Sequence, residues 1–310
     1  MASLKELLAR EEIIAPGHRL CPGCGAAIVA RMVTKAANKP LVVSCATGCL
    51  EVSTTIYPFT SWKSSFLHVA FENSAASLSG VEAAYRALKK KGKIKEDMQF
   101  IAFGGDGGLY DIGFQSLSGA LERGHRMLTV CYDNGAYMNT GVQRSSATPR
   151  GANTTTSPAG KAAYGKKEYP KDLTACVVAH NIPYVAQASP SHWNDLMKKV
   201  EKALAVDGPS FINILSPCPL GWKHPGEETI EIAKLAIDTG FWQLYEVENG
   251  VYKLNYHPKQ RKPLREWLEK QGRFRHLFTP ENKHILQELQ EHLDKKWEKL
   301  LKLCGETESK

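Results

Sequence analysis

The stretch that decides the fold is Met98-Gln-Phe-Ile-Ala-Phe-Gly-Gly-Asp-Gly-Gly108. Its first six residues form an apolar run that predicts a buried strand, and the glycine cluster ends this run. The next apolar residues are spaced by three and four over 114–121, which predicts a helix. A second apolar run over 126–132 predicts another strand. Strand, helix and strand in this order form a βαβ unit, which is typical of a parallel sheet.

The same alternation continues on both sides of this unit. Further strands are predicted over 39–44, 184–188 and 210–215, and further helices over 73–91, 173–177 and 193–204. We therefore expect an α/β fold, in which helices cover both faces of a parallel sheet. Residues 144–170 are rich in Ser, Thr, Gly, Pro and Lys and predict a long loop, a feature that is usually functional or disordered.

The pattern changes near residue 224. We expect residues 1–224 to form the α/β domain and residues 225–310 to form a C-terminal extension. The extension shows no sheet-like periodicity that we can identify, and its apolar content predicts no core of its own. It is expected to wrap over the domain or over another subunit, and to end in an amphipathic helix over 281–303.

Composition limits the possible functions. The chain has 310 residues, 43% of them hydrophobic, and no stretch approaches the roughly 20 apolar residues that span a bilayer. The net charge of +8 suits an acidic protein partner; the lysines are scattered along helices, so nucleic acid is not expected. Residues 1–10 predict a short amphipathic helix without a cleavable apolar segment. We therefore expect a cytoplasmic protein whose eight cysteines are reduced.

The glycine cluster carries a candidate diphosphate site. Glycines let a phosphate approach the backbone, and the Asp106 carboxylate can hold Mg²⁺ or Ca²⁺. Asn134 follows the next predicted strand, so its side chain and the carbonyl of Ala136 can share the same ion. Gly-Asp-Gly alone is more often a tight turn in which Asp caps a helix. The Asn in a βαβ context favours the metal, whereas the motifs of Rossmann dinucleotide sites and Walker loops are absent here.

A second candidate site consists of cysteines. Cys21 and Cys24 flank Pro-Gly, a turn that can point two thiolates at one metal. Cys49 directly follows a predicted strand, and Cys218 follows the last predicted strand. Four thiolates suit a [4Fe–4S] cluster or tetrahedral zinc. Cys45 is the alternative to Cys49 as a ligand at this site.

Several motifs in order resemble one family, the β subunits of pyruvate:ferredoxin oxidoreductases. The motifs are Gly17-His-Arg-Leu-Cys-Pro-Gly-Cys-Gly25, Ala46-Thr-Gly-Cys-Leu-Glu-Val52, Phe71-Glu-Asn73, Gly104-Gly-Asp-Gly-Gly108 and Tyr137-Met-Asn-Thr-Gly141. The likeness extends from about residue 11 to the last predicted helix. It implies a thiamine diphosphate (TPP) fold that carries Mg²⁺ and one [4Fe–4S] cluster.

The resemblance also implies roles for individual residues. The cluster ligands would be Cys21, Cys24, Cys49 and Cys218, and the Mg²⁺ ligands Asp106, Asn134 and the carbonyl of Ala136. The residues in contact with TPP would be Cys49, Gly105, Asp106, Gly107, Gly108, Asn134, Gly135, Ala136, Tyr137, Met138 and Asn139. Ala26 would make at most a packing or backbone contact. Asn139 would lie beside the thiazolium and the substrate, as the catalytic residue of this chain.

The implied reaction oxidatively decarboxylates pyruvate, with coenzyme A as acyl acceptor and ferredoxin as electron acceptor. An α subunit would supply the glutamate on the aminopyrimidine and most of the substrate pocket, and γ- and δ-type subunits would carry further clusters. The alternatives are a relative that acts on another 2-oxoacid or on oxalate, such as a 2-oxoisovalerate or oxalate oxidoreductase, a non-redox TPP decarboxylase or ligase with structural zinc, and a non-catalytic assembly subunit.

Overall fold

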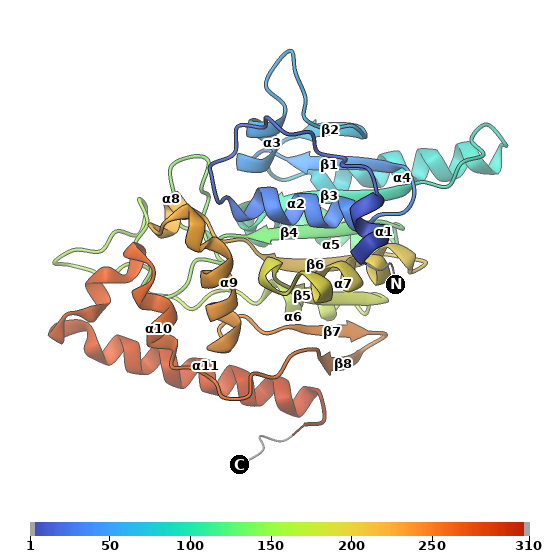
Figure 1. Ribbon diagram of the computed structural model, residues 1–310. Coiled ribbons are helices and arrows are strands. Elements are labelled where there is room, and N and C mark those ends of the chain that lie inside the picture. The colour runs from blue at the N-terminus through green and yellow to red at the C-terminus, as the bar shows by residue number, and fades with distance from the viewer. Residues whose placement is uncertain (1–3, 307–310) are drawn as a thin grey trace.

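The computed structural model describes residues 4–306, and its centre is an eight-stranded sheet in the order β2-β1-β3-β4-β6-β5-β7-β8 (Figure 1). Strands β1 to β6 all run parallel to one another. They are β1 (Leu41–Ala46), β2 (Ser65–Val69), β3 (Gln99–Gly105), β4 (Leu128–Asp133), β5 (Tyr184–Ala188) and β6 (Ser210–Leu215). The parallel sheet and its βαβ units are thus confirmed.

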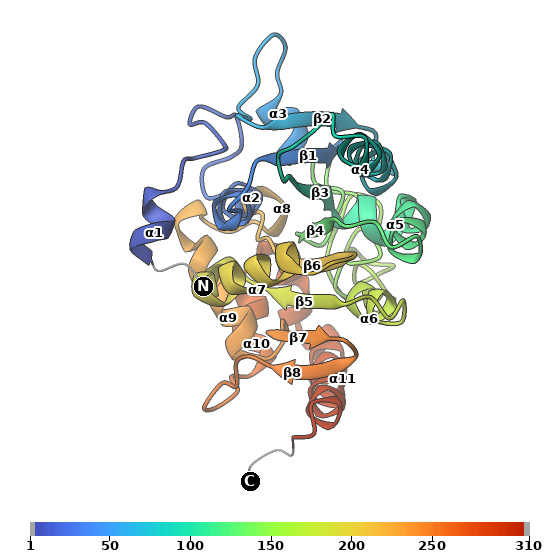
Figure 2. The same cartoon turned by 90° about the vertical axis from the view of Figure 1, so that its right-hand side faces the viewer.

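Helices cover both faces of this sheet, as predicted. Figure 2 shows α2 (Gly25–Ala36) and α7 (Trp193–Ala205) on one face, and α4 (Ser74–Lys90), α5 (Phe114–Glu122) and α6 (Leu173–Val178) on the other. The short α1 (Leu4–Ala9) confirms part of the predicted N-terminal helix, and residues 1–3 of that prediction lie outside the described residues.

Strands covered on both faces need apolar side chains at successive positions. In β1, Val43 belongs to the core on the side of α2 and α7, whereas its neighbour Val42 belongs to the core beneath α4. All six residues of β1 are buried. This explains why the central strands read as continuous apolar runs in the sequence.

The glycine cluster continues into a helix of unusual geometry. A π-helical turn, Gly107–Ile112, directly follows Asp106 and leads into α5. The short α3 (Cys49–Thr54) follows β1 in a similar way. Sequence periodicity predicted neither of these turns, nor α2 and β2. Turns of six residues are too short to show a helical period.

The expectation that residues after 224 show no sheet pattern is wrong. β7 (Tyr245–Glu248) pairs antiparallel with β5, and β8 (Val251–Leu254) pairs antiparallel with β7. The two strands are joined by Asn249-Gly250, whose φ values of 49° and 82° are those of a two-residue hairpin turn. The signal was therefore present in the sequence, as alternating residues around Asn-Gly.

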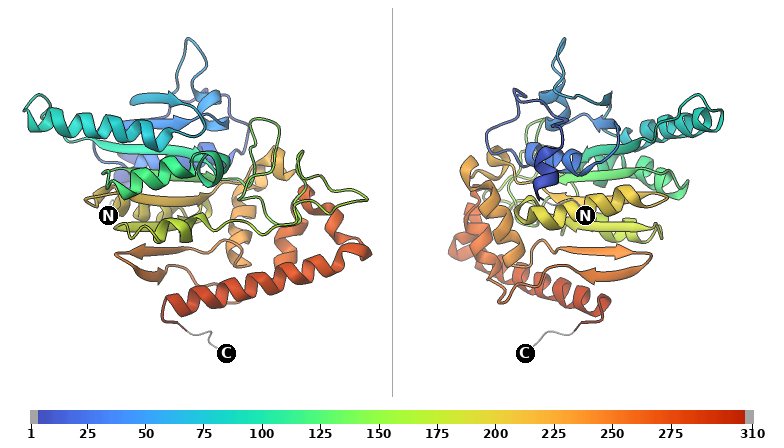
Figure 3. Two further views of the ribbon diagram at one scale, coloured as in Figure 1. Left: turned by 180° about the vertical axis from the view of Figure 1, so that it is seen from behind. Right: turned by 45° about the vertical axis from the view of Figure 1, so that its right-hand side comes forward.

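The C-terminal residues also share a core with the earlier part of the chain. The segment contains α9 (Thr229–Asp238), α10 (Leu264–Glu269) and α11 (Lys283–Leu303), and the short α8 (Pro219–Trp222) precedes it. Their buried side chains form one cluster with Leu215 of β6, so this segment shares its core with the sheet. Figure 3 shows α10 and α11 at the same end of the sheet as the loop 144–170.

Within residues 4–306, no helix combines the length and the apolar character that a bilayer crossing requires. The predicted loop is confirmed, because residues 144–170 contain no helix and no extended strand, only the isolated bridge between Ala159 and Tyr164.

Candidate active site

Most of the predicted cofactor residues line one small cavity at the carboxyl ends of β1, β3 and β4. In open α/β sheets this edge is where ligands bind. The lining residues are Thr47, Gly48, Cys49, Phe71, Gly105, Asp106, Gly107, Gly108, Tyr132, Asn134, Ala136, Tyr137, Met138 and Asn139. Thr47, Gly48, Phe71 and Tyr132 were not among the predicted cofactor residues, although the first three stand within the quoted motifs.

Two predicted cofactor residues do not line this cavity. Ala26 is buried in α2, in the core beneath the sheet. Gly135 has a φ of 73° and faces the opposite side of its loop, where a Cβ atom would lie 3.1 Å from Arg273 Nη1. For both residues, a role in cofactor binding stays a prediction.

Three oxygen-bearing groups converge at the end of β3 and β4. One terminal atom of the Asn134 side-chain amide lies 3.0 Å from Asp106 Oδ1 and 2.8 Å from the Ala136 carbonyl oxygen. With nitrogen in that position the amide donates two hydrogen bonds and closes the site. If the Asn134 amide group is instead rotated by 180°, its oxygen lies beside the Asp106 carboxylate oxygen and the Ala136 carbonyl oxygen. Carboxylate, amide and carbonyl oxygens are the ligands of Mg²⁺ and Ca²⁺, so this set fits such an ion.

Two buried carboxylates, Asp106 and Asp133, lie at this point. Asp106 is fully buried, and burial followed by the nearby charge of Asp133 raises its pKa well above the usual value. Burial also raises the pKa of Asp133 to about 6, against hydrogen bonds from the Tyr110 hydroxyl and the Gly135 N–H. Two buried carboxylates repel each other, and a divalent cation would offset that repulsion.

The glycines of the cluster allow close contacts. A Cβ atom on Gly107 would lie 2.4 Å from the Tyr137 ring, and one on Gly108 would lie 2.9 Å from the Phe71 carbonyl oxygen. Tyr137 in turn donates a hydrogen bond to the Gly107 carbonyl at 2.8 Å. Side chains at these positions would displace Tyr137 and close the cavity, so the glycine requirement is steric.

The Cys21–Cys24 turn packs on the segment that carries Cys218. The Cys24 N–H donates to the Cys21 carbonyl at 3.0 Å, and the Gly25 N–H donates to the Pro217 carbonyl at 3.0 Å. A Cβ atom on Gly25 would lie 2.8 Å from the Pro217 backbone, so only glycine permits this approach. The structure thereby brings two distant parts of the sequence together.

All four predicted cluster cysteines lie within electrostatic reach of one another. Burial, and next the thiolates of Cys218, Cys24 and Cys21, raise the pKa of Cys49 to about 12. Bound metal would favour the charged thiolates instead. Among residues 4–306, no three His, Cys, Asp or Glu side chains stand at the spacing of ligands to a single ion.

Cys45 differs from Cys49 in its surroundings. It is fully buried in the core, where burial and then the charge of Glu51 raise the pKa of its thiol, and its Sγ contacts the Ala46 carbonyl at 3.7 Å. None of the other cysteines contributes to that shift. These surroundings favour Cys49 over Cys45 as the partner of the other three thiols.

The oxygen site, which consists of Asp106, Asn134 and the Ala136 carbonyl, lies next to the cysteine site. A Cβ atom on Gly221 would lie 2.2 Å from Met138 Sδ and 3.4 Å from Cys218 Sγ, so Met138 stands between the two sites. The Trp222 indole N–H donates to the Asn134 carbonyl at 2.6 Å. Cys49 belongs to both sites, because it lines the cavity and lies near the other thiols.

Comparisons with known proteins agree with this geometry. The family model for the thiamine pyrophosphate enzyme C-terminal TPP-binding domain matches residues 46–214. The pyruvate synthase subunit PorB of Thermotoga maritima is 54% identical, over 99% of this chain and 96% of that protein. The ketoisovalerate oxidoreductase subunit VorB of Pyrococcus abyssi is 43% identical, over 95% of this chain and 94% of that protein.

A solved structure shares the fold. A chain of the 2-oxoglutarate:ferredoxin oxidoreductase from Magnetococcus marinus aligns with a TM-score of 0.57 and 20% identity, over 72% of this chain and 79% of that one. The match over residues 46–214 includes the glycine cluster and the Asp106–Asn134 pair. The chain therefore belongs to the pyruvate synthase PorB family of thiamine pyrophosphate enzymes.

Proposed function

We propose that the chain is the β subunit of a pyruvate:ferredoxin oxidoreductase, which converts pyruvate and coenzyme A to acetyl-CoA and CO₂ and passes electrons to ferredoxin. The observation that carries this proposal is the shared position of Cys49. It lines the small cavity and lies among the thiols, so a cofactor in the cavity and a cluster on the cysteines would be neighbours.

The small cavity would hold the diphosphate end of TPP. Asp106, Asn134 and the Ala136 carbonyl would bind Mg²⁺, and the backbone of residues 105–108 would face the phosphates. When bound, TPP supplies the electron sink that lets a 2-oxoacid lose CO₂. Ser145 donates to the Asp106 carboxylate and the Asn134 N–H donates to it at 3.3 Å, so the chain orients this ligand before metal arrives.

The cysteine site would hold one [4Fe–4S] cluster through Cys21, Cys24, Cys49 and Cys218. Cys24, Cys49 and Cys218 are partly buried and Cys21 is exposed. Burial keeps water from the inner side of the cluster, and the exposed side leaves a route for electrons to leave. Reduced thiols need a reducing compartment, so we place the protein in the cytoplasm.

Asn139 would orient the substrate. It is exposed, lines the open side of the small cavity, and follows Met138, which stands between the two sites. Its amide can donate to or accept from a bound 2-oxoacid. The residues that line the small cavity include no glutamate, so we propose that an α subunit supplies the aminopyrimidine glutamate and that γ- and δ-type subunits and ferredoxin complete the assembly.

The nearest alternative substrate is a branched-chain 2-oxoacid. One relative at 43% identity is a ketoisovalerate oxidoreductase subunit, so the family includes more than one substrate. A non-redox decarboxylase or ligase with zinc on the cysteines is the alternative from another class.

The test is ferredoxin reduction by the purified complex, with pyruvate or 2-oxoisovalerate and with or without coenzyme A. We expect the higher kcat/KM with pyruvate and a requirement for coenzyme A. A higher value with 2-oxoisovalerate would assign the chain to the branched-chain enzyme, and 2-oxoacid decarboxylation without ferredoxin reduction would assign it to the non-redox class.

A further inference from the structure

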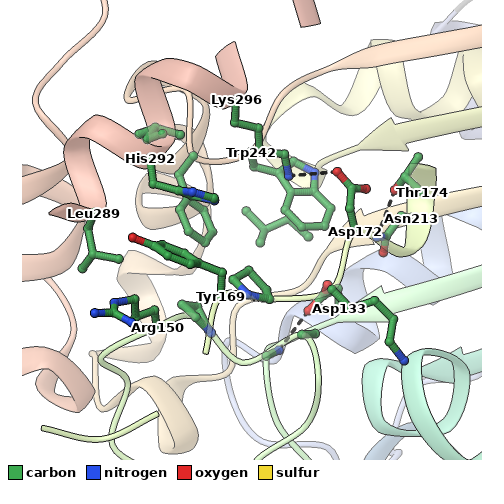
Figure 4. A pocket seen from close by; sticks show the side chains of 18 of the residues that line it. Asp133, Arg150, Tyr169, Asp172, Thr174, Asn213, Trp242, Leu289, His292 and Lys296 are labelled. Atoms are coloured by element: carbon green, nitrogen blue, oxygen red, sulfur yellow. Dashed lines mark hydrogen bonds and ion pairs between the residues drawn. The ribbon is translucent and has the colours of Figure 1, made fainter. Parts of the chain in front are cut away.

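A second cavity, of about 400 Å³, is lined by Asp133 and Gly135, the two neighbours in sequence of Asn134, which lines the small cavity. Figure 4 shows this second cavity from close by. It is bounded by the carboxyl ends of β4, β5 and β6, by the segment 169–172 and by α11. Its volume is within the range of about 300–1,000 Å³ that is typical of small-molecule sites. The proposed function leaves this cavity without a role. We refer to it as the α11 cavity.

The walls of the α11 cavity are mostly apolar and aromatic. Figure 4 shows Trp242, Leu289 and the stacked pair Tyr169 and His292 around it, and the two stacked rings are 3.8 Å apart. Burial lowers the pKa of His292, and the charges of Lys296, Lys295 and Arg150 lower it further, so the ring is neutral at pH 7. Such walls suit the flat apolar body of a small organic molecule.

A buried cation without a carboxylate partner stands on the inner wall. Arg273 is 2% exposed, its Nε donates to Gln271 Oε1 at 2.9 Å, and its guanidinium lies 4.2 Å from the centre of the Trp222 ring. Within residues 4–306 it forms no ion pair with a carboxylate. Burial lowers its pKa to about 9, against the charges of Cys218, Asp133 and Asp106. An unpaired buried guanidinium is costly, and a bound anion would offset that cost.

The entrance adds positive charge. The basic side chains that line the α11 cavity are Arg150, Lys171, Arg273, Lys295, Lys296 and Lys299, against two carboxylates, Asp133 and Asp172. Lys296 pairs with Asp172 at 3.4 Å, Arg150 with Glu288 at 2.7 Å and Lys171 with Asp111 at 3.8 Å. The remaining excess of positive charge would attract an anion toward the opening.

We propose that the α11 cavity binds a small organic carboxylate with an aromatic or apolar body. The carboxylate would meet the edge of the Arg273 guanidinium, because one face of that group is stacked on Trp222 and its N–H groups point along the plane. The body would lie between Trp242, Tyr169 and Leu289. This site is separate from the small cavity and does not depend on pyruvate being the substrate.

Calorimetry on the purified complex with two matched probes tests the proposal. Indole-3-acetate carries the carboxylate, and indole-3-acetamide has the same body without charge. We expect the acid to bind at least tenfold more tightly than the amide. Arg273→Gln should remove that preference, while leaving the affinity for the amide unchanged.

Leu289→Trp is the second variant, because Leu289 lines the α11 cavity where the body of the ligand is expected, and a larger side chain there would occupy that space. We expect it to abolish binding of both probes while the melting temperature and TPP binding stay at wild-type values. If the two probes bind equally to the wild type, or if Leu289→Trp leaves their binding unchanged, the proposal is wrong. The Leu289→Trp variant tests the proposal even if Arg273→Gln fails to fold.

Discussion

At the scale of single residues, the site depends on where a few side chains point. Asn134 can face Asp106 and the Ala136 carbonyl with either end of its amide, and only the oxygen end completes a set of three metal ligands. Cys49 and Cys45 are four positions apart, yet one lies with the other thiols and the other is closed within the core. Both distinctions can be tested by substitution.

Asp106→Ala should weaken metal-dependent TPP binding. A charge-assisted ligand contributes roughly 1.5–3 kcal/mol, so we expect affinity to fall by roughly 10- to 100-fold in the presence of Mg²⁺. Titration calorimetry with and without a chelator measures the effect. Asp207→Ala, at an exposed position, is the control. A visible spectrum that loses its cluster absorption would show that the change has disrupted the fold instead.

Cys49→Ser and Cys45→Ser should differ in iron content. We expect Cys49→Ser to lose most of its iron, because serine oxygen is a poor ligand for a cluster. Cys45→Ser should keep its iron and lose stability, because it places a hydroxyl in an apolar core. Iron analysis of the anaerobically purified variants distinguishes them. If only Cys45→Ser lost its iron, Cys45 would be the cluster ligand and Cys49 would not.

Predictions for single residues were most accurate where the spacing of residues along the chain determined their positions in the sheet. Asp106 and Asn134 end neighbouring strands of a parallel sheet, so their meeting followed from the βαβ pattern. Trp222 and Arg273 were not identified, because their importance lies in contacts across the fold that no local pattern encodes. The lining roles of Thr47 and Tyr132 were missed for the same reason.

At the scale of elements, the loop 144–170 braces the oxygen site. Lys166 is 1% exposed and donates to the carbonyls of Ser145, Ser146 and Thr148, the last at 2.7 Å. Ser145 donates to Asp106, and Thr148 donates to the Gly135 carbonyl at 2.7 Å. One lysine therefore holds the segment that contacts both strand ends of the site.

Lys166→Met should weaken TPP binding although Lys166 does not line the small cavity. Three carbonyls lose their donor, at about 1–3 kcal/mol for each buried group left unpaired, and Ser145 loses its fixed position. We expect roughly tenfold lower TPP affinity at pH 7 by calorimetry. Lys167→Met, at the exposed neighbouring position, should bind TPP as the wild type does. If Lys166→Met and Lys167→Met bound TPP equally well, Lys166 would not be needed to hold the segment that contacts Asp106.

The same lysine predicts a pH effect on stability. Burial, and next the charge of Arg144, lower the pKa of Lys166 to about 8. Between about pH 8 and the ordinary lysine value the unfolded chain then binds more protons than the folded chain, so this group raises the free energy of unfolding as pH rises. In urea titrations, the wild type should gain stability over Lys166→Met from pH 8 to 10. If the difference in unfolding free energy between the wild type and Lys166→Met stayed constant from pH 8 to 10, the lowered pKa of Lys166 would be contradicted.

The last helix should contribute to the stability of the whole fold. Ile285 of α11 is fully buried, and its truncation to Ala should cost about 2–5 kcal/mol of unfolding free energy. Leu303→Ala, near the end of the same helix and 47% exposed, should cost less than about 0.5 kcal/mol. Urea denaturation of the full-length chain compares the two. Similar costs would mean that α11 is not part of the core.

At the scale of the whole molecule, one sheet edge unites both proposed cofactor sites and the α11 cavity. The parallel core was predictable, because its strands are buried on both faces and read as apolar runs. After residue 224, the predicted last helix is confirmed as α11, whereas the shorter helices of this segment were not predicted. The hairpin β7–β8 was not predicted either, although its Asn-Gly turn is a recognisable signal that was overlooked.

The central claim is that this chain carries an iron–sulfur cluster beside a TPP site. The most direct test is the iron, acid-labile sulfide and zinc content of the anaerobically purified chain. We predict about four irons and four sulfides per chain, and no stoichiometric zinc. Zinc without sulfide would contradict the claim, and would leave a TPP enzyme without a redox centre on this chain.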